Sequence, residues 1–181
     1  MSIVLRRPAA EEAETLARLH IRCWHEAYAE IVPPEILART DVAARIAAWR
    51  RSIGDASRIV VAAYDREEPV GFVIAGRRED DVFEGADGQI AALYIAASHQ
   101  RRGLGSRLLA AAARQWLARG GRSLALGVLA ANAGARSFYE GLGGRLVKTG
   151  TYSWDGHPIP DAIYVFEDLP DLARRAPDNI A

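Results

Sequence analysis

The sequence predicts a single mixed α/β domain, with a twisted central sheet of about seven strands flanked by helices. An apolar run at residues 89–95, a helical segment at 104–119 and a second apolar run at 123–129 follow one another, which is the order of a parallel strand–helix–strand unit. Other apolar runs come in pairs joined by short turns, as antiparallel hairpins do. The 181 residues can bury a substantial core, and 50% of them are hydrophobic.

The N-terminal third is expected to supply one strand and two helices. The strand covers residues 2–7 and ends at a proline. Residues 9–30 show a helical period of apolar side chains, at Ala13, Leu16, Leu19, Cys23, Ala27 and Ile31. The prolines at 33 and 34 end this helix, since a proline disfavours helical conformation in the residue before it. A second helix follows over 35–54, in one piece or in two, with Asp41 as a suitable N-cap.

The rest of the chain is divided by turn residues. Outside the strand–helix–strand unit, the expected elements are strands at 57–64 and 70–76, a polar acidic loop at 77–88, a short helix at 133–140, and strands at 145–154 and 159–167. Residues 169–181 are polar and contain two prolines, so we expect a loose tail after a domain of residues 1–168.

Composition excludes several functional classes. Lys+Arg and Asp+Glu are equal at 23 each, so no net charge draws the chain to nucleic acid or to a membrane. The single cysteine, Cys23, excludes an intrachain disulfide, and on a predicted helix it is expected to be a buried, unreactive thiol. The 4 histidines lack metal-ligand spacing, so no metal site is expected. Neither a signal peptide nor an apolar run of membrane-spanning length is recognisable, which favours a cytoplasmic protein.

The most informative stretch is the turn Ser98-His-Gln-Arg-Arg-Gly-Leu-Gly-Ser106, between the strand at 89–95 and the following helix. A strand, a glycine turn and a helix N-terminus place unpaired backbone N–H groups at one point, which suits a phosphate. Arg101 and Arg102 add positive charge. A Walker loop would need Lys after its last glycine, and a dinucleotide fingerprint would need a third glycine where Leu108 stands, so neither fits. An ordinary strand-to-helix turn is the alternative.

A second motif follows the strand at 123–129, with Asn132, Ala135, Phe138-Tyr139-Glu140 and Leu142-Gly143 in fixed spacing. Together with Gln100-Arg-Arg-Gly103-Leu-Gly105, it resembles the two motifs of the GNAT N-acetyltransferase superfamily, and the element order is similar over nearly the whole chain. The resemblance implies splayed central parallel strands. It also implies transfer of an acetyl group from acetyl-CoA, as co-substrate, to an amine of a small molecule or peptide by direct attack in a ternary complex.

The resemblance further implies roles for individual residues. The turn that binds the pyrophosphate of coenzyme A comprises Gln100, Arg101, Arg102, Gly103, Leu104, Gly105 and Ser106. The strand carrying Leu93, Tyr94 and Ile95 would pair with the pantetheine arm, and an N–H near Leu93 or Tyr94 would polarise the thioester carbonyl. Asn132 would hydrogen-bond the pantetheine. Tyr139 would protonate or hydrogen-bond the leaving thiolate, with a core aromatic role as the alternative.

The general base is open. Many relatives carry a glutamate at the start of the central strand, where this chain has Gln89, which cannot accept a proton. Glu84, Asp87 or a chain of waters could take its place, or the acceptor amine could arrive sufficiently deprotonated. Gln89, Glu84 and Asp87 are also candidates to contact the acceptor, and Glu84, Asp87, Glu26 and Glu30 supply negative charge that would suit a cationic amine.

The acceptor and the oligomeric state are not fixed by the sequence. Trp24, Tyr28 and Trp154 fall on elements that bound the acceptor site in relatives, although core packing is the alternative for each. Because Gln89 replaces an acid, a non-catalytic acyl-CoA-binding module is the second hypothesis, and a binder of another phosphorylated ligand is the third. A homodimer through a sheet edge or the last hairpin is compatible with the sequence.

Overall fold

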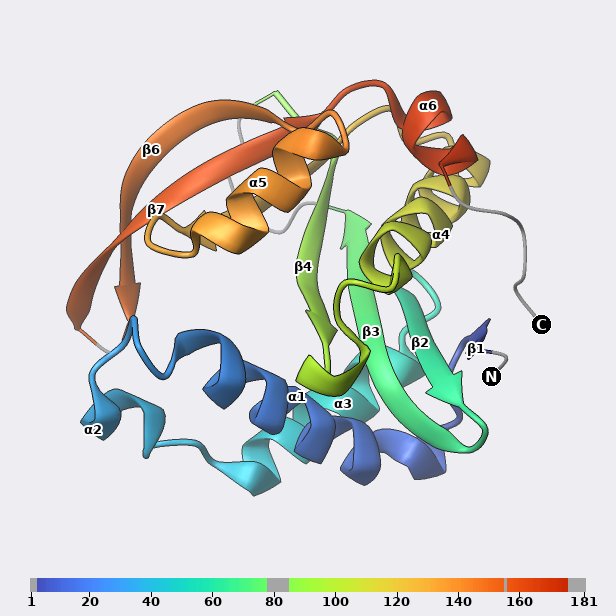
Figure 1. Cartoon of the computed structure of the whole chain (residues 1–181). Helices are drawn as coiled ribbons and strands as arrows, with labels where there is room; N and C mark the ends of the chain where they lie inside the picture. Colours follow the sequence, from blue (N-terminus) through green and yellow to red (C-terminus); the bar gives the residue numbers. More distant parts are fainter. Residues whose placement is uncertain (1–2, 78–84, 155, 176–181) are drawn as a thin grey trace.

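The structure is a computed structural model that describes residues 3–77, 85–154 and 156–175. Its centre is a seven-stranded sheet in the order β1-β2-β3-β4-β5-β7-β6 (Figure 1). The strands are β1 (Ile3–Arg6), β2 (Ile59–Asp65), β3 (Glu68–Arg77), β4 (Gly88–Ile95), β5 (Leu124–Leu129), β6 (Arg145–Trp154) and β7 (His157–Phe166). The predicted mixed sheet flanked by helices is confirmed.

Neighbouring strands run antiparallel except for β4 and β5, which are parallel. The pairs β2–β3 and β6–β7 are the two predicted hairpins. Helix α4 (Leu104–Ala118) connects β4 to β5, as expected for a parallel strand–helix–strand unit. β7 pairs with β5, so the last hairpin completes the sheet on the side away from β1.

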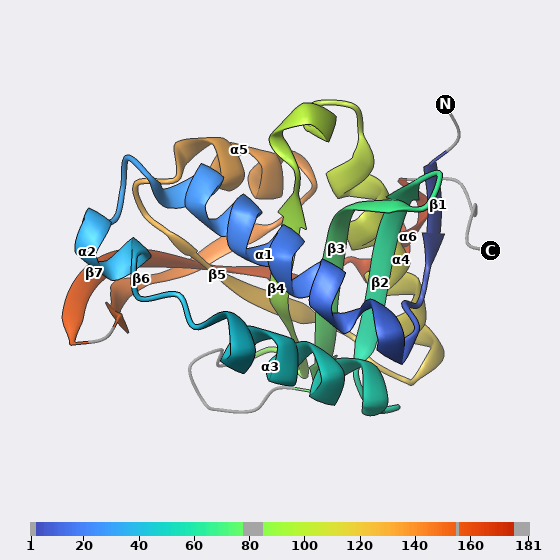
Figure 2. The ribbon, with the colours of Figure 1, turned by 90° about the horizontal axis from the view of Figure 1, so that it is seen from below.

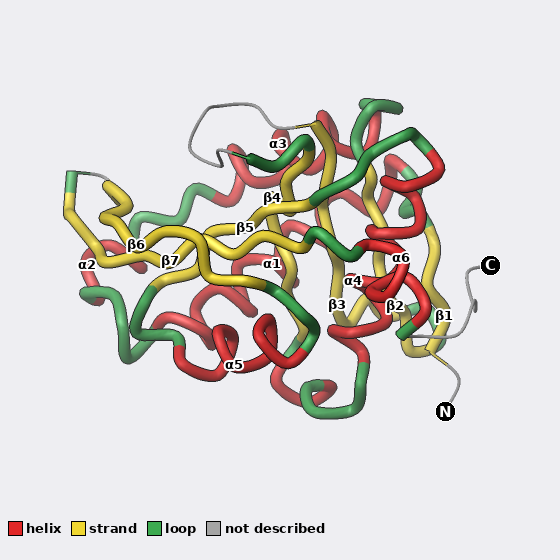
Figure 3. Tube along the Cα trace, turned by 90° about the horizontal axis from the view of Figure 1, so that it is seen from above, coloured by secondary structure: helices red, strands yellow, loops and turns green. Residues whose placement is uncertain are grey.

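Helices cover both faces of the sheet. Helices α1 (Ala13–Tyr28) and α3 (Val42–Gly54) lie against one face (Figure 2), whereas α4, α5 (Ala133–Gly141) and α6 (Leu169–Arg174) lie against the other (Figure 3). The side chains of β2 alternate between these layers. Ile59, Val61 and Ala63 join the core under α4, while Val60, Ala62 and Tyr64 join the core under α1 and α3. One sheet therefore separates two hydrophobic cores.

The segment after α1 is divided as one of the two sequence alternatives had it. A short helix α2 (Pro34–Leu37) is separate from α3, and the Asp41 side chain accepts a hydrogen bond from the Ala44 N–H at 3.0 Å. Such an N-cap satisfies one of the donors that a helix start leaves unpaired.

The expectation of a loose tail from residue 169 is wrong for residues 169–174, which form α6. Leu169 and Leu172 are buried in the core that α4 covers, and the Arg114 side chain donates to the carbonyl of Ala173 at 2.6 Å. Asp168 caps the helix, and its proline lies in the first turn, where the missing N–H costs no hydrogen bond. Apolar burial against α4 outweighs the polar composition of the segment. In the described ranges no helix is long and apolar enough to cross a membrane.

Candidate functional site

The site begins where the parallel strands separate. Within the described residues, β4 pairs with β5 only at Gly88↔Leu124 and Gln89↔Ala125. Against β3, the register shifts between Ile74 and Ala75, so that Ala91 is an extra residue in β4. An extra residue bends a strand and increases its twist. The splayed central strands are therefore confirmed, and the bulge supplies a local cause.

A cleft of about 740 Å³ lies beyond the point of separation. Its walls are β4, the middle of β5, the turn that begins α4, the start of α5 and the C-terminal part of α1. Most of the residues predicted for the coenzyme line it, namely Leu93, Tyr94, Ile95, Gln100, Arg101, Gly103, Leu104, Gly105, Ser106, Asn132 and Tyr139. The volume lies in the range of ordinary ligand sites. Segments distant in sequence are thus brought to one cleft.

The turn before α4 opens the helix N-terminus toward this cleft. Gly103 is the N-cap residue, with φ of +75°, and Arg101 also has a positive φ, of 58°. The first intrahelical bond runs from the Arg107 N–H to the Gly103 carbonyl, so the preceding N–H groups of the first turn have no intrahelical acceptor. These donors and the helix dipole create a positive end suited to an anion.

The two glycines of the turn are required for different reasons. Nothing lies within 4 Å of a Cβ added to Gly103, so its left-handed conformation, rather than space, favours glycine. At Gly105 an added Cβ would stand 2.9 Å from the Phe138 ring and 3.3 Å from Ile95. Gly105 therefore allows α4 to pack closely on α5 and β4.

A polar side chain holds the turn in place, and the three arginines near it, Arg101, Arg102 and Arg107, point to different surroundings. The Gln100 amide donates to the carbonyl of Ile95 at 3.0 Å, which ties the turn to the end of β4. Arg101 lines the cleft, whereas Arg102 is exposed and does not line it. Arg107 donates to the carbonyl of Ile3 at 3.0 Å and so serves the β1 side.

His99 and Glu26 line the cleft in addition to the residues predicted for the coenzyme. His99 lies 3.4 Å from a carboxylate oxygen of Asp65, and its other ring nitrogen lies 2.9 Å from the Ser98 hydroxyl. Glu26, on α1, accepts a hydrogen bond from the Ala97 N–H at 3.1 Å. His99 stands within the glycine-turn stretch and could have been proposed from it. Glu26 was expected only to supply negative charge near the acceptor, and no local pattern marks its hydrogen bond to Ala97, which is 71 positions away.

Three tyrosine side chains meet in the cleft: Tyr28 of α1, Tyr94 of β4 and Tyr139 of α5. The Tyr94 hydroxyl donates to the Tyr28 hydroxyl at 3.4 Å. Burial raises the pKa of Tyr139, and the nearby Tyr28 adds to the effect. Burial also raises the pKa of Tyr94 and of Tyr28. All three phenols are therefore neutral hydrogen-bond donors across the ordinary pH range.

Asn132 has a structural role in addition to the predicted one. Its side-chain oxygen accepts a hydrogen bond from the Ala135 N–H at 3.1 Å and caps α5. Since the amide also carries two N–H donors, it can still donate into the cleft that it lines.

Trp24 and Trp154, predicted for the acceptor site, pack against one another. Their ring centroids are 4.7 Å apart, and both belong to a hydrophobic cluster that joins α1 to the last hairpin. Tyr28 contacts both rings and lines the cleft, which Trp24 and Trp154 do not. Of the three predicted aromatic residues, Tyr28 is the one that the structure brings to the cleft.

Of the acidic and amide candidates, Gln89 and Asp87 do not line the cleft. Gln89 faces a smaller cavity beside Asp55 and Arg58. The Asp87 carboxylate accepts hydrogen bonds from backbone donors just before β5 and from the Trp116 indole of α4, and its contact with the acceptor stays a prediction. Glu84 lies outside the described residues.

Cys23 lies on the buried side of α1. The thiol is buried, and burial raises its pKa to about 12, which is consistent with the expected unreactive role. In the described part of the chain no group of three or more histidine, cysteine or acidic side chains could hold a metal ion.

The sequence is similar to those of known acetyltransferases. The profile of the Acetyltransferase (GNAT) family matches residues 13–143. A Bacillus subtilis (strain 168) protein, the uncharacterized N-acetyltransferase YuaI, is 28% identical over 131 residues, which make up 72% of this chain and 73% of that protein.

Two solved structures illustrate the similarity of fold. The PaiA N-acetyltransferase from Thermoplasma acidophilum, in complex with coenzyme A, has a TM-score of 0.72 and 21% identity, covering 92% of this chain and 99% of its own. yncA from Salmonella typhimurium, with its cofactor acetyl-CoA, has a TM-score of 0.70 and 15% identity over 100% of both chains. With the family profile spanning most of its length, this chain belongs to the GNAT acetyltransferase family.

Proposed function

We propose that this protein transfers the acetyl group of acetyl-CoA to an amine by direct attack. One observation carries the proposal. A single cleft has the exposed N-terminus of α4 and the unpaired edge of β4 in its walls, together with the neutral phenol of Tyr139. These are the groups that a ligand with a pyrophosphate, an amide-rich arm and a thioester requires.

The groups that line the cleft match the successive parts of coenzyme A. The first-turn N–H groups of α4, with Arg101 at the same end, suit the pyrophosphate. Beyond Gln89, β4 has no ladder to β5, so its backbone groups are available to pair with the pantetheine amides as another strand would. The Asn132 amide can donate to the same arm.

Acetyl-CoA supplies a thioester as the acyl donor. A backbone N–H near Leu93 or Tyr94 would donate to the thioester oxygen as negative charge develops on it. The bond from the amine nitrogen to the acyl carbon forms, the nitrogen loses one proton to water, the carbon–sulfur bond breaks, and its electron pair leaves on sulfur. Because the raised pKa of Tyr139 exceeds that of a thiol, the phenol stabilises the thiolate by hydrogen bonding, and solvent protonates the sulfur.

The acceptor amine is proposed to reach the cleft uncharged. Gln89 cannot take a proton and lies outside the cleft, and Asp87 is occupied by other donors. The rate should therefore rise with pH up to the pKa of the acceptor amine itself.

A non-catalytic acyl-CoA-binding role is the second candidate, favoured by Gln89 where an acid would serve as base. The two functions separate in an assay of thiol release from acetyl-CoA over a panel of amines. Amine-dependent release above hydrolysis excludes the non-catalytic role. Binding of coenzyme A without release for any amine excludes the enzyme.

Coenzyme A binding itself is tested with a pair of matched glycine variants. Gly103 and Gly143 both have positive φ, of +75° and +89°, and a Cβ at either meets nothing within 4 Å. Each change to alanine should cost about 1 kcal/mol of conformational strain. Only Gly103→Ala should weaken calorimetric binding of coenzyme A, by about 5-fold. Equal affinities in both variants would contradict the pyrophosphate assignment, and absence of binding to the wild-type protein at millimolar coenzyme A would end the proposed function.

A further inference from the structure

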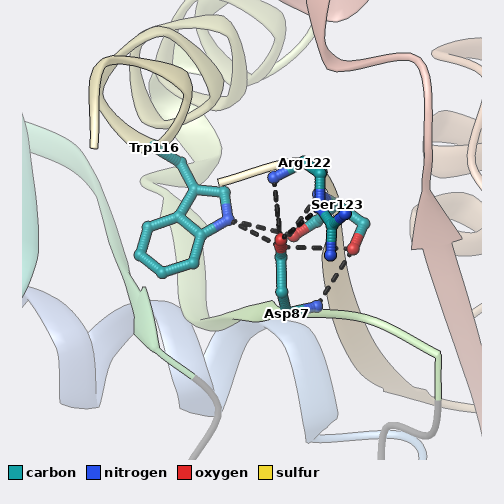
Figure 4. A network of polar contacts seen from close by, with 4 residues as sticks. All are labelled: Asp87, Trp116, Arg122 and Ser123. Atoms are coloured by element: carbon teal, nitrogen blue, oxygen red, sulfur yellow. Dashed lines mark hydrogen bonds and ion pairs between the residues drawn. The ribbon is translucent and has the colours of Figure 1, made fainter. Parts of the chain in front are cut away.

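The closed end of the β4–β5 pair, where the two strands are still hydrogen-bonded to one another, is held by a compact polar network around Asp87 (Figure 4). The carboxylate accepts hydrogen bonds from the Arg122 N–H at 2.9 Å and from the Ser123 N–H at 2.9 Å. The indole N–H of Trp116 and the hydroxyl of Ser123 add further donors, at 3.1 and 3.2 Å. In return, the Asp87 N–H donates to the Ser123 hydroxyl at 3.0 Å. One side chain thus joins the start of β4, the start of β5 and the end of α4.

The network favours the ionised carboxylate. Burial alone would raise the pKa of Asp87, but the hydrogen bonds from Ser123, Trp116 and Arg122 outweigh it, and the pKa is lowered. The guanidinium of Arg122 lies 3.5 Å away but is 89% exposed, so the ion pair adds little. Backbone and indole donors, rather than a cation, hold the charge.

The Trp116 indole fills the space between the start of β4 and the turn before β5. A Cβ added to Gly88 would stand 2.5 Å from the indole, and one added to Gly121 would stand 2.1 Å from its nitrogen. The indole N–H also contacts the carbonyl of Ser123 at 3.1 Å. The ring is therefore enclosed between the first residue of β4 and the turn that leads into β5.

The network lies where it can set the separation of the elements that form the walls of the cleft. β4 and β5 share only two ladder pairs, both next to Asp87, and beyond them the strands diverge. The same α4 that ends at Trp116 and its neighbours begins at the cleft with Gly103 and Leu104. A change at the closed end therefore alters the separation of β4, β5 and the α4 N-terminus together, since packed elements move as rigid units.

We propose that Asp87 is a positioning residue. It fixes β4, β5 and α4 at the closed end of the β4–β5 pair and so holds the coenzyme site in its binding geometry. This inference rests on the proposed function, because the site it positions is the proposed coenzyme site.

The test is calorimetric binding of coenzyme A to Asp87→Asn, which keeps the size of the side chain but removes its charge and places an amide NH2 group against the Arg122 N–H that Oδ2 accepts. Its affinity for coenzyme A should fall about 10-fold. Ser123→Ala, which removes one hydroxyl and is expected to fold, should show a smaller loss in the same direction. In both variants, the amides of residues 122 and 123 should exchange with deuterium faster.

Glu12→Gln is the matched control. Glu12 is another carboxylate that joins separate segments, through Arg6 at 2.8 Å and the Ala9 N–H at 2.7 Å, and it does not line the cleft. Its variant should lose thermal stability and bind coenzyme A like the wild-type protein. That contrast separates positioning from a general loss of stability.

Three results would overturn the inference. Asp87→Asn could bind as tightly as the wild-type protein, or Glu12→Gln could lose as much affinity as Asp87→Asn, and either shows that Asp87 does not position the site. If the wild-type protein binds no coenzyme A, the proposed function and this inference both fail. In the first two cases only the inference fails, because the wild-type protein still binds.

Discussion

At the closed end of the β4–β5 pair, Asp87 gathers donors from α4 and β5, whereas at the open end the same two strands border a cleft of about 740 Å³. Polar groups at the closed end satisfy one another. At the open end the β4 backbone has no ladder to β5, and the first-turn donors of α4 lack intrahelical acceptors. The protein therefore stabilises the β4–β5 pair at its closed end, and this allows backbone groups at the open end to stay unpaired.

Glycines make the same contrast. Gly88 and Gly121, at the closed end, are required because Trp116 occupies the space where a Cβ would be. Gly103, at the open end, has free space around it and is required for its positive φ. The first kind should be sensitive through stability, and the second through binding.

The largest effect is expected at the open end, from Tyr139→Phe. The side chain is 8% exposed and keeps its packing as phenylalanine, while the hydrogen bond proposed between the phenol and the departing thiolate would be lost. Turnover in the thiol-release assay should fall about 100-fold, with coenzyme A affinity and Tm nearly unchanged. Tyr152→Phe, at an exposed position on β6, is the control and should keep full turnover. An undiminished rate for Tyr139→Phe would assign Tyr139 to core packing alone.

The next effect belongs to the closed end. Gly121→Ala would force a Cβ against the Trp116 indole and should lower the free energy of unfolding by about 2 kcal/mol, measured by urea denaturation. Gly141→Ala, in α5 with nothing within 4 Å of the added Cβ, should be neutral or stabilising. Equal stability of the two variants would mean that the closed end is not packed as tightly as its contacts indicate.

Sequence and structure agree where the signal is local. The glycine turn, the N-cap at Asp41 and both hairpins depend on neighbouring residues, and periodicity or turn chemistry was enough to predict them. The packing of α6 depends on Leu169 and Leu172 meeting α4, which is far away in the chain. A polar stretch with prolines therefore gave the wrong prediction for residues 169–174.

The site divides in the same way. Motif spacing brought out the turn and the Asn132 segment, both of which line the cleft. The hydrogen bonds of Asp87 were not predicted, because its partners Trp116 and Ser123 are 29 and 36 positions away and nothing near it in the sequence marks them. His20, which was given no role, is buried beside Tyr94 for an equally non-local reason.

The smallest effect is a change of stability with pH, which separates His20 at the open end from Asp87 at the closed end. His20 packs behind Tyr94 at the open end and against Trp49 and Phe72. Its Nδ1 is buried, and no hydrogen-bond partner for it occurs among the described residues. Burial, with a smaller contribution from Arg45, lowers its pKa to about 3. The unfolded chain binds a proton below about pH 6.5 while the folded chain does not, so stability falls as the pH drops from 6.5 toward 3.

By pH 6 this loss should reach about 1 kcal/mol, and His20→Phe should abolish it. Asp87 has the opposite charge state but the same direction of shift, and its stabilising effect is complete above the unfolded pKa of about 4 and declines only below it. The Asp87→Asn variant should therefore retain the loss of stability between pH 7 and 5. If Asp87→Asn abolished that loss and His20→Phe did not, the acid sensitivity would belong to the closed end and the assignment of His20 would be wrong.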